Sequence, residues 1–172
     1  PGEGRILTNI NQLLFWVDTQ YSIQTAKAVA ENITKVNTSK VDLIYTIETN
    51  ASVIEGPSAG AALATATVAL LENKNLRSDV AITGTINPDG TIGPVGSIVA
   101  KAEASKGAGV KIFLVPSGQG VQTSYTPTTV CQKFGGLEYC TTEYKKQKIN
   151  VTSESGLEII EVGSIEEALK YF

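Results

Sequence analysis

A serine between two glycines stands at the head of the most apolar helical stretch of the chain. The run Glu55-Gly-Pro-Ser-Ala-Gly60 is followed as far as Leu71 by residues that are small or apolar almost all round. A helix of that composition is expected to be buried and central. Residues 41–47 alternate apolar and polar side chains, which predicts a strand leading toward the turn. We therefore expect a strand, a tight turn at Ser58 and a buried helix over Ala59–Leu71.

The same run has chemical meaning. Gly56–Gly60 satisfies the G-x-S-x-G nucleophile elbow, which exposes a serine hydroxyl on a tight turn. Such a serine normally uses a histidine as its base, and this chain contains no histidine. A nucleophilic Ser58 therefore needs another base, and a lysine whose ammonium form is disfavoured by burial is the obvious substitute. Lys101 lies within the apolar run Ile98–Ala104, a poor place for a solvated ammonium.

Purely structural interpretations stand beside this one. Gly56 and Gly60 would also let a strand turn tightly into a packed helix, with Ser58 as its cap. Lys101 is equally consistent with an exposed lysine on the polar face of an amphipathic helix, where most lysines lie. Spacing alone does not choose between these interpretations. An esterase that uses the elbow serine is disfavoured by the lack of histidine.

Length and composition limit the architecture and the partners. The 172 residues, 42% of them apolar, suit one compact domain. A net charge of −3 provides no basic field that would recruit nucleic acid or an anionic membrane. No apolar run approaches the roughly 20 residues that cross a bilayer. Because the sequence starts at Pro1, we expect it to be trimmed, and a signal peptide or a membrane anchor that was removed is left as an open alternative.

The two cysteines are placed to face each other. A two-residue turn at Gly135-Gly136 pairs Phe134 with Leu137, and counting outward pairs Cys131 with Cys140. That pair is expected at a non-hydrogen-bonded position, where strands lie closest and a disulfide fits. Two free buried thiols are the alternative, but the polar segment offers no core to bury them.

Four sequences fit the N-glycosylation acceptor pattern, beginning at Asn32, Asn37, Asn50 and Asn150. Single matches are often accidental in a threonine-rich chain. Together with the expected disulfide, they favour a location outside the cytoplasm or a membrane-anchored protein with an external catalytic domain.

Helices and strands alternate along the rest of the chain, interrupted by hairpin signals, which indicates an α+β or mixed α/β fold. Residues 117–151 are polar and predict a surface insertion on the domain. Ser97 is expected to cap a helix to about Lys106, and Ser164-Ile-Glu-Glu167 predicts a capping box. The other expected elements are strands within Arg5–Asp18, a helix over Thr19–Thr34, and strands over Asp79–Ile86, Val110–Val115 and Leu157–Val162.

The chain resembles the proteolytic domain of Lon-type proteases, which use a serine–lysine dyad. Ser58 and Lys101 are 43 positions apart, as the nucleophile and the lysine are in that family. The resemblance implies a Lon protease domain-like fold (ribosomal protein S5 domain 2-like) and covers nearly the whole chain outside the insertion. The matching residues are Gly4-Arg5, Asp18–Ser22, Glu55–Gly60, Thr83–Ile86, Gly90, Pro94–Gly96, Lys101, Gly109, Val115-Pro116 and the closing strand and helix.

The resemblance implies a role for each matched residue. Ser58 corresponds to the nucleophile and Lys101 to its general base. Thr83 corresponds to a threonine whose hydroxyl helps to hold the lysine amine, and Glu55 to an acidic position beside the site. The helix start also makes sense as an oxyanion site, with the backbone N–H groups of Ser58 and Ala59 as donors.

Two departures from the family pattern refine the expected function. The chain has no G-x-x-x-x-G-K-[ST] phosphate loop, and the segment with Cys131 and Cys140 is not part of the usual domain. Both features resemble the ATPase-less Lon-like proteases of archaea. We expect an endopeptidase that acts on unfolded or extended polypeptides without its own ATPase, a metal or a cofactor. A homo-oligomer and a membrane tether stay open, as does an inactive Lon-like fold that serves as a peptide-binding or assembly module.

Overall fold

The computed structural model describes residues 2–10, 14–15, 17–48, 53–54 and 56–172. Helices and strands are mixed along the chain, as the sequence predicts. In chain order the elements are β1 (Ile6–Ile10), β2 (Leu14–Phe15), α1 (Val17–Thr34), β3 (Leu43–Ile47), β4 (Val53–Ile54), the 3₁₀ turn η1 (Pro57–Ala59), α2 (Gly60–Leu71), β5 (Val80–Ile82), β6 (Thr85–Ile86), β7 (Ile92–Gly93), α3 (Ile98–Gly107), β8 (Ile112–Pro116), β9 (Val121–Phe134), β10 (Leu137–Asn150), α4 (Val151–Ser155), β11 (Glu158–Val162) and α5 (Ile165–Ala168).

A parallel sheet with the order β11-β8-β5 lies between two layers of helices. Its central strand, β8, is buried on both faces, which explains its continuous apolar sequence. Leu114 packs into one core cluster with residues of α1, α2 and α5. Phe113 and Val115 point the other way and pack with residues of α3 and α4. The sheet therefore separates the helix that follows Ser58 from the helix that carries Lys101.

Helices α1 and α2 pack through small side chains. Ala26 and Ala30 of α1 and Ala61 and Ala64 of α2 are all fully buried. Small residues let two helices approach closely. The expected burial of α2 is confirmed along most of its length, with Leu70 exposed near its C-terminal end.

The predicted strand over Asp79–Ile86 is wrong as one continuous element. The structure divides it into β5 and β6 at Thr83 and Gly84. The N–H of Gly84 donates to the C=O of Ser58, and its C=O accepts from the N–H of Ala61. The ladder is interrupted because this backbone is hydrogen-bonded to the start of α2 instead.

Other expectations hold with local corrections. Two strands and a helix follow the N-terminus, but α1 begins at Val17, so the strand prediction as far as Asp18 is wrong at its end. Ser97 precedes α3 in a left-handed conformation and makes no side-chain cap, so its expected capping role is wrong. Ser164 does cap α5 by accepting from the N–H of Glu167, whereas the Glu167 carboxylate accepts from Gly163.

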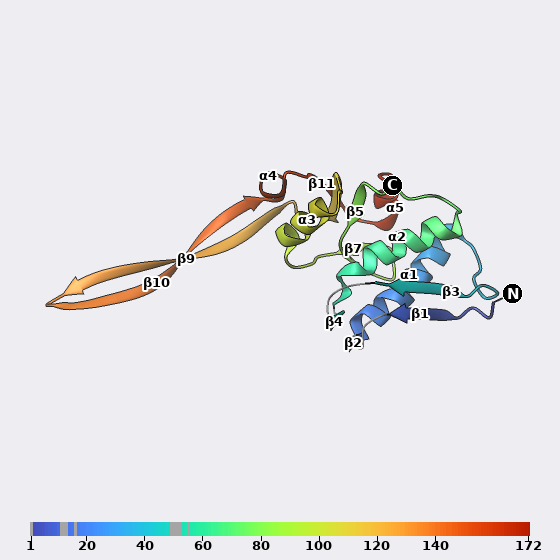
Figure 1. Ribbon diagram of the computed structural model, residues 1–172, viewed down its shortest axis with the longest axis horizontal. Helices are drawn as coiled ribbons and strands as arrows, with labels where there is room; N and C mark the ends of the chain where they lie inside the picture. Colours follow the sequence, from blue (N-terminus) through green and yellow to red (C-terminus); the bar gives the residue numbers. More distant parts are fainter. Residues whose placement is uncertain (1, 11–13, 16, 49–52, 55) are drawn as a thin grey trace.

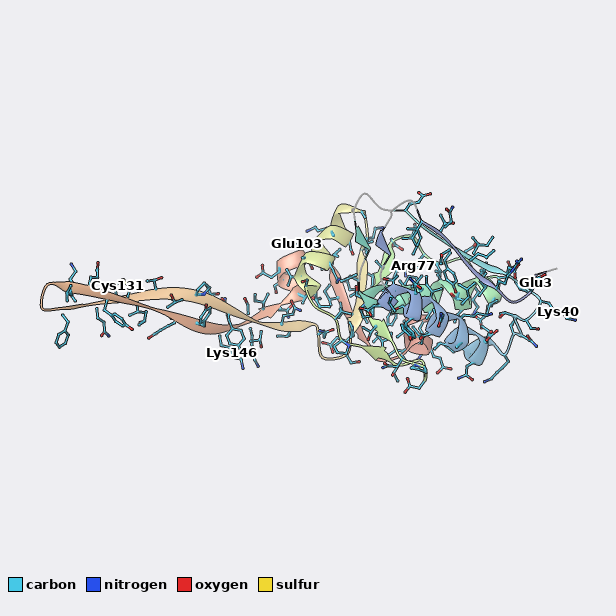
Figure 2. All side chains as sticks on the ribbon, turned by 90° about the horizontal axis from the view of Figure 1, so that it is seen from below. Glu3, Lys40, Arg77, Glu103, Cys131 and Lys146 are labelled. Atoms are coloured by element: carbon cyan, nitrogen blue, oxygen red, sulfur yellow. A yellow bond between two sulfur atoms is a disulfide. The ribbon has the colours of Figure 1, made fainter. Side chains whose placement is uncertain are left out.

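The polar segment forms a long hairpin of β9 and β10 that projects away from the rest of the molecule (Figure 1). Phe134 pairs with Leu137 and Cys131 with Cys140, which confirms the predicted register. The two cysteines form a disulfide with a Cα–Cα distance of 4.0 Å, and Figure 2 places Cys131 toward the far end of the hairpin. No helix in the described ranges is long and apolar enough to cross a membrane.

Candidate active site

Ser58 lies in the short turn that leads into α2. Gly56, at the start of the turn, has a φ of 85°, a left-handed value that favours glycine, and Pro57 then begins η1. The C=O of Ser58 accepts hydrogen bonds from the N–H of Gly84 at 3.0 Å and from the hydroxyl of Thr83 at 3.2 Å. The backbone of Ser58 is therefore fixed to the segment between β5 and β6, and its side chain is half-buried.

Gly60 is required by close packing at the same turn. A Cβ at this position would lie 2.7 Å from Cγ2 of Ile86 and 2.9 Å from its backbone N. Such separations are too short for carbon–carbon or carbon–nitrogen contacts. The glycine on the C-terminal side of Ser58 thus lets α2 start directly against β6.

Lys101 comes from the first turn of α3, where its N–H donates to the C=O of Ser97 at 3.0 Å. Its side chain is half-buried, and its Nζ lies 3.4 Å from Oγ of Ser58. This distance is slightly beyond the usual reach of a nucleophile–base hydrogen bond, which is often looser without substrate. The structure therefore brings together the two residues that the sequence analysis selected as nucleophile and base.

Thr83 is buried beside this pair, but its hydroxyl donates to the C=O of Ser58. In the described contacts Thr83 thus supports the serine rather than the amine of Lys101. Glu55, the fourth predicted residue, lies outside the described residues.

The start of α2 is where the oxyanion site is expected. The N–H of Gly60 donates to the C=O of Pro57, and the N–H of Ala61 donates to the C=O of Gly84. Both groups are therefore already used within the protein. The expected donors precede them, at Ser58 and Ala59, and their role stays a prediction.

An open groove of about 300 Å³ contains the Ser58–Lys101 pair. Its other lining residues are small or apolar: Ala59, Ala62, Ile82, Thr83, Ala104, Ser105 and Phe113. Because α2, β5, α3 and β8 all contribute, several of these residues were missed by the sequence analysis. Ser105 carries one signal, since it lies four positions after Lys101 and therefore on the same face of α3.

Gln119 also escaped the sequence analysis. Its side-chain amide is hydrogen-bonded to both the N–H and the C=O of Val95, in the loop before α3. The contact joins two loops that are 24 positions apart. A glutamine in a polar segment carries no local signal of such a contact.

Comparisons with known proteins identify the family of this chain. Residues 16–143 match the family model of the Lon protease (S16) C-terminal proteolytic domain. The chain is 32% identical to the Lon protease of Phenylobacterium zucineum over 120 residues, which cover 68% of this chain and 15% of that protein. It is 28% identical to the archaeal Lon protease of Thermococcus kodakarensis over 152 residues, or 88% of this chain and 23% of that protein.

A third relative, the Lon protease of Azospirillum brasilense, is 28% identical over 174 aligned residues, which cover 99% of this chain and 19% of that protein. The chain thus spans less than a quarter of the length of these relatives. The match to the family model includes both Ser58 and Lys101 and extends over most of the chain. The chain therefore belongs to the family of Lon protease C-terminal proteolytic domains.

Proposed function

We propose that this domain is a serine endopeptidase in which Ser58 is the nucleophile and Lys101 the general base. The observation that carries the proposal is the 3.4 Å separation between Lys101 Nζ and Ser58 Oγ inside the groove. A nucleophile next to a base, with a place for substrate beside both, is the geometry that covalent catalysis requires.

The proposed reaction begins with Lys101 in its neutral form. Its amine takes the proton of the Ser58 hydroxyl as Oγ attacks the peptide carbonyl. The resulting ammonium then gives that proton to the leaving amine, which leaves an acyl-enzyme on Ser58. Lys101 next removes a proton from water, which attacks the ester, and returns it to Oγ as the acid product departs.

The oxyanion of each tetrahedral intermediate would rest on the backbone N–H groups of Ser58 and Ala59. The positive end of α2 adds to this stabilisation, since a helix N-terminus favours negative charge. Thr83 supports the arrangement through the C=O of Ser58. We therefore propose a supporting role for Thr83 on the nucleophile side of the dyad.

The shape and lining of the groove indicate what kind of substrate it could bind. It is open and lined by small or apolar side chains from several elements. A polypeptide chain must be extended to place one peptide bond against Ser58, and an extended segment can bind by adding a strand to a sheet edge. We therefore propose unfolded or extended polypeptides as substrates, cleaved without an ATPase module in this chain.

Further properties belong to the same proposal. The fold is proposed to be of the ribosomal protein S5 domain 2-like type, in one domain with an insertion at about 117–151. The disulfide of Cys131 and Cys140 supports a location outside the cytoplasm or a membrane-anchored protein with an external catalytic domain. Finding two free thiols in protein isolated without reductant would remove that support.

Digestion of a permanently unfolded protein such as reduced casein tests the proposed function. The wild type should degrade casein, whereas Ser58→Ala and Lys101→Ala should not, with Tm close to that of the wild type. Ser78→Ala and Lys170→Ala are matched controls at exposed positions and should degrade casein normally. A wild-type protein that binds casein without cutting it would instead identify a peptide-binding module.

A further inference from the structure

Gln119 connects the loop before the hairpin to the loop before α3. The N–H of Val95 donates to Oε1 of Gln119 at 2.9 Å, and Nε2 of Gln119 donates to the C=O of Val95 at 2.8 Å. Both residues are half-buried. An amide that pairs with a peptide unit in this way fixes its direction as well as its distance. The backbone at Val95 is therefore held at one place on the body of the protein.

The loop that carries Gln119 is itself fixed by Glu161 of β11. The N–H of Gly118 donates to Oε2 of Glu161 at 2.7 Å, and the N–H of Gly120 donates to Oε1 at 2.8 Å. Hydrogen bonds to a carboxylate are stronger than those between neutral groups. A Cβ at Gly120 would lie only 2.6 Å from Oε1 of Glu161. The N–H groups on both sides of Gln119 thus bind one carboxylate, which orients the glutamine between them.

Val95 lies two residues before Ser97, from which α3 begins. Ser97 has φ 56° and ψ 39°, a left-handed conformation, and its C=O accepts the N–H of Lys101. Because Ser97 provides no side-chain cap, the start of α3 depends on the backbone before it. Gln119 can therefore influence the position of the Lys101 amine only indirectly, through the backbone of Val95 and Ser97.

Helix α3 is also held by contacts that do not involve Gln119. Nζ of Lys106 donates to the C=O of Ser155 in α4 at 2.8 Å. Ile98 and Ala102 are fully buried in the cluster that contains Phe113. With these contacts in place, loss of the Gln119 amide should loosen the loop before α3 and the hydrogen bond from the Lys101 N–H to the Ser97 C=O without unfolding the helix.

We propose that Gln119, oriented by Glu161, is a positioning residue for Lys101 in the proposed peptidase, on whose dyad this inference rests. Gln119 does not line the groove, so it acts through Val95 and not on substrate. The amine already lies 3.4 Å from the Ser58 hydroxyl. A displacement of about 1 Å can lower a rate by roughly 100-fold. Loss of the amide should therefore reduce kcat by about 10- to 100-fold and change KM by less than about twofold.

Gln119→Leu tests the proposal, because leucine is of similar size and cannot hydrogen-bond. Glu161→Gln is a second variant. Its side-chain amide has only one oxygen to accept from the N–H groups of Gly118 and Gly120, so kcat should fall in this variant as well. Gln132→Leu is the matched control: Gln132 is exposed on the distal half of β9. Each variant is measured in two experiments. Hydrolysis of a fluorogenic peptide gives kcat and KM, and hydrogen exchange gives the exchange rate of the backbone N–H of Lys101.

In Gln119→Leu we expect the fall in kcat, little change in KM, and faster exchange at Lys101, with exchange in α2 as in the wild type. Unchanged kcat together with unchanged exchange would overturn the proposal. Faster hydrogen exchange throughout the core clusters on both faces of the sheet, together with altered KM and Tm, would also overturn it. Gln119 would then stabilise the whole fold and not the position of Lys101 in particular. If Gln119→Leu does not fold, Glu161→Gln decides by the same criteria. Activity that persists in Lys101→Ala refutes the dyad instead, and the exchange result remains interpretable without it.

Discussion

The amine of Lys101 lies 3.4 Å from the hydroxyl of Ser58, although the two residues are 43 positions apart in the chain. Ser58 stands in the turn before α2, and Lys101 in the first turn of α3. The separation between the two side chains therefore depends on tertiary packing around the intervening sheet. Substitutions at the start of either helix should therefore lower peptidase activity even where the protein stays folded.

Gly60→Ala should impair both stability and activity. Its new Cβ would approach the side chain and the backbone of Ile86 to less than 3 Å, and overpacking of this kind costs about 1–3 kcal/mol. Because Ser58 lies two positions earlier, the turn should move and peptidase activity should fall at least about tenfold. Urea unfolding and peptide hydrolysis measure the two effects.

Gly107→Ala provides the control for that variant. Gly107 ends α3, and a Cβ there meets open space. Alanine is favoured over glycine in helices by about 0.5–1 kcal/mol, so stability should be equal or slightly higher and activity unchanged. A Gly60→Ala protein that behaves like Gly107→Ala would refute the close contact with Ile86.

Thr83→Val should weaken the site through the nucleophile. Valine keeps the shape of threonine but removes the hydroxyl that donates to the C=O of Ser58. Loss of one such hydrogen bond costs about 1 kcal/mol, and kcat should fall several-fold because Ser58 is less firmly held. Thr83→Ser, which keeps the donor, should restore most of kcat. If Thr83→Ser is as slow as Thr83→Val, the hydroxyl is not the functional group.

Much of the site could be predicted from the sequence because its signals are local. The glycines beside Ser58 and the apolar surroundings of Lys101 lie within short runs, and both residues occur where expected. The register of the hairpin could also be counted outward from Gly135-Gly136. Neighbouring residues determine the turn at Ser58 and the hairpin register, whereas the pairing of Ser58 with Lys101 is expected from the resemblance to Lon-type proteases.

The rest depends on contacts that no short segment encodes. The break between β5 and β6 arises because Gly84 is hydrogen-bonded to Ser58 and Ala61 rather than to a neighbouring strand. Ser97 provides no side-chain cap for α3, and Val95, two residues before it, is hydrogen-bonded to Gln119, 24 positions along the chain. The groove likewise combines side chains of separate elements. No local sequence pattern around Phe113 or Ala62 predicts that these residues line the groove.

The ion pair of Arg5 and Asp42 should make stability depend on pH. The Arg5 guanidinium, together with the N–H groups of Arg5 and Glu3, holds the pKa of the Asp42 carboxyl far below its usual range. A carboxyl with a lowered pKa stabilises the fold above its unfolded pKa of about 3.9, and this contribution is lost as the pH falls toward the folded pKa.

Asp42→Asn should therefore lower the free energy of unfolding near neutral pH, and the difference from the wild type should shrink as the solution is acidified below about pH 4. Urea unfolding at several pH values measures this difference. A deficit of constant size across the whole range would show that the charge of Asp42 is not responsible.

The double variant Cys131→Ser/Cys140→Ser should loosen the hairpin but keep the active site. The disulfide closes a loop of about ten residues, so the chain-entropy model gives a contribution of roughly 2–3 kcal/mol. The bond lies far along β9 and β10, and Cys131 is away from the body of the molecule, on which Glu103 of α3 lies (Figure 2). Limited proteolysis should cut residues 121–150 faster in the variant, with peptide hydrolysis unchanged. Lost hydrolysis would mean that the hairpin shapes the site.

The identity of the nucleophile and its base can be measured in one labelling experiment. A fluorophosphonate reacts with a serine hydroxyl only when a base activates it, and mass spectrometry locates the adduct. The proposed dyad predicts a single adduct on Ser58 in the wild type, formed at least about tenfold more slowly in folded Lys101→Ala. An adduct on another residue, or labelling of Lys101→Ala at the wild-type rate, would contradict it.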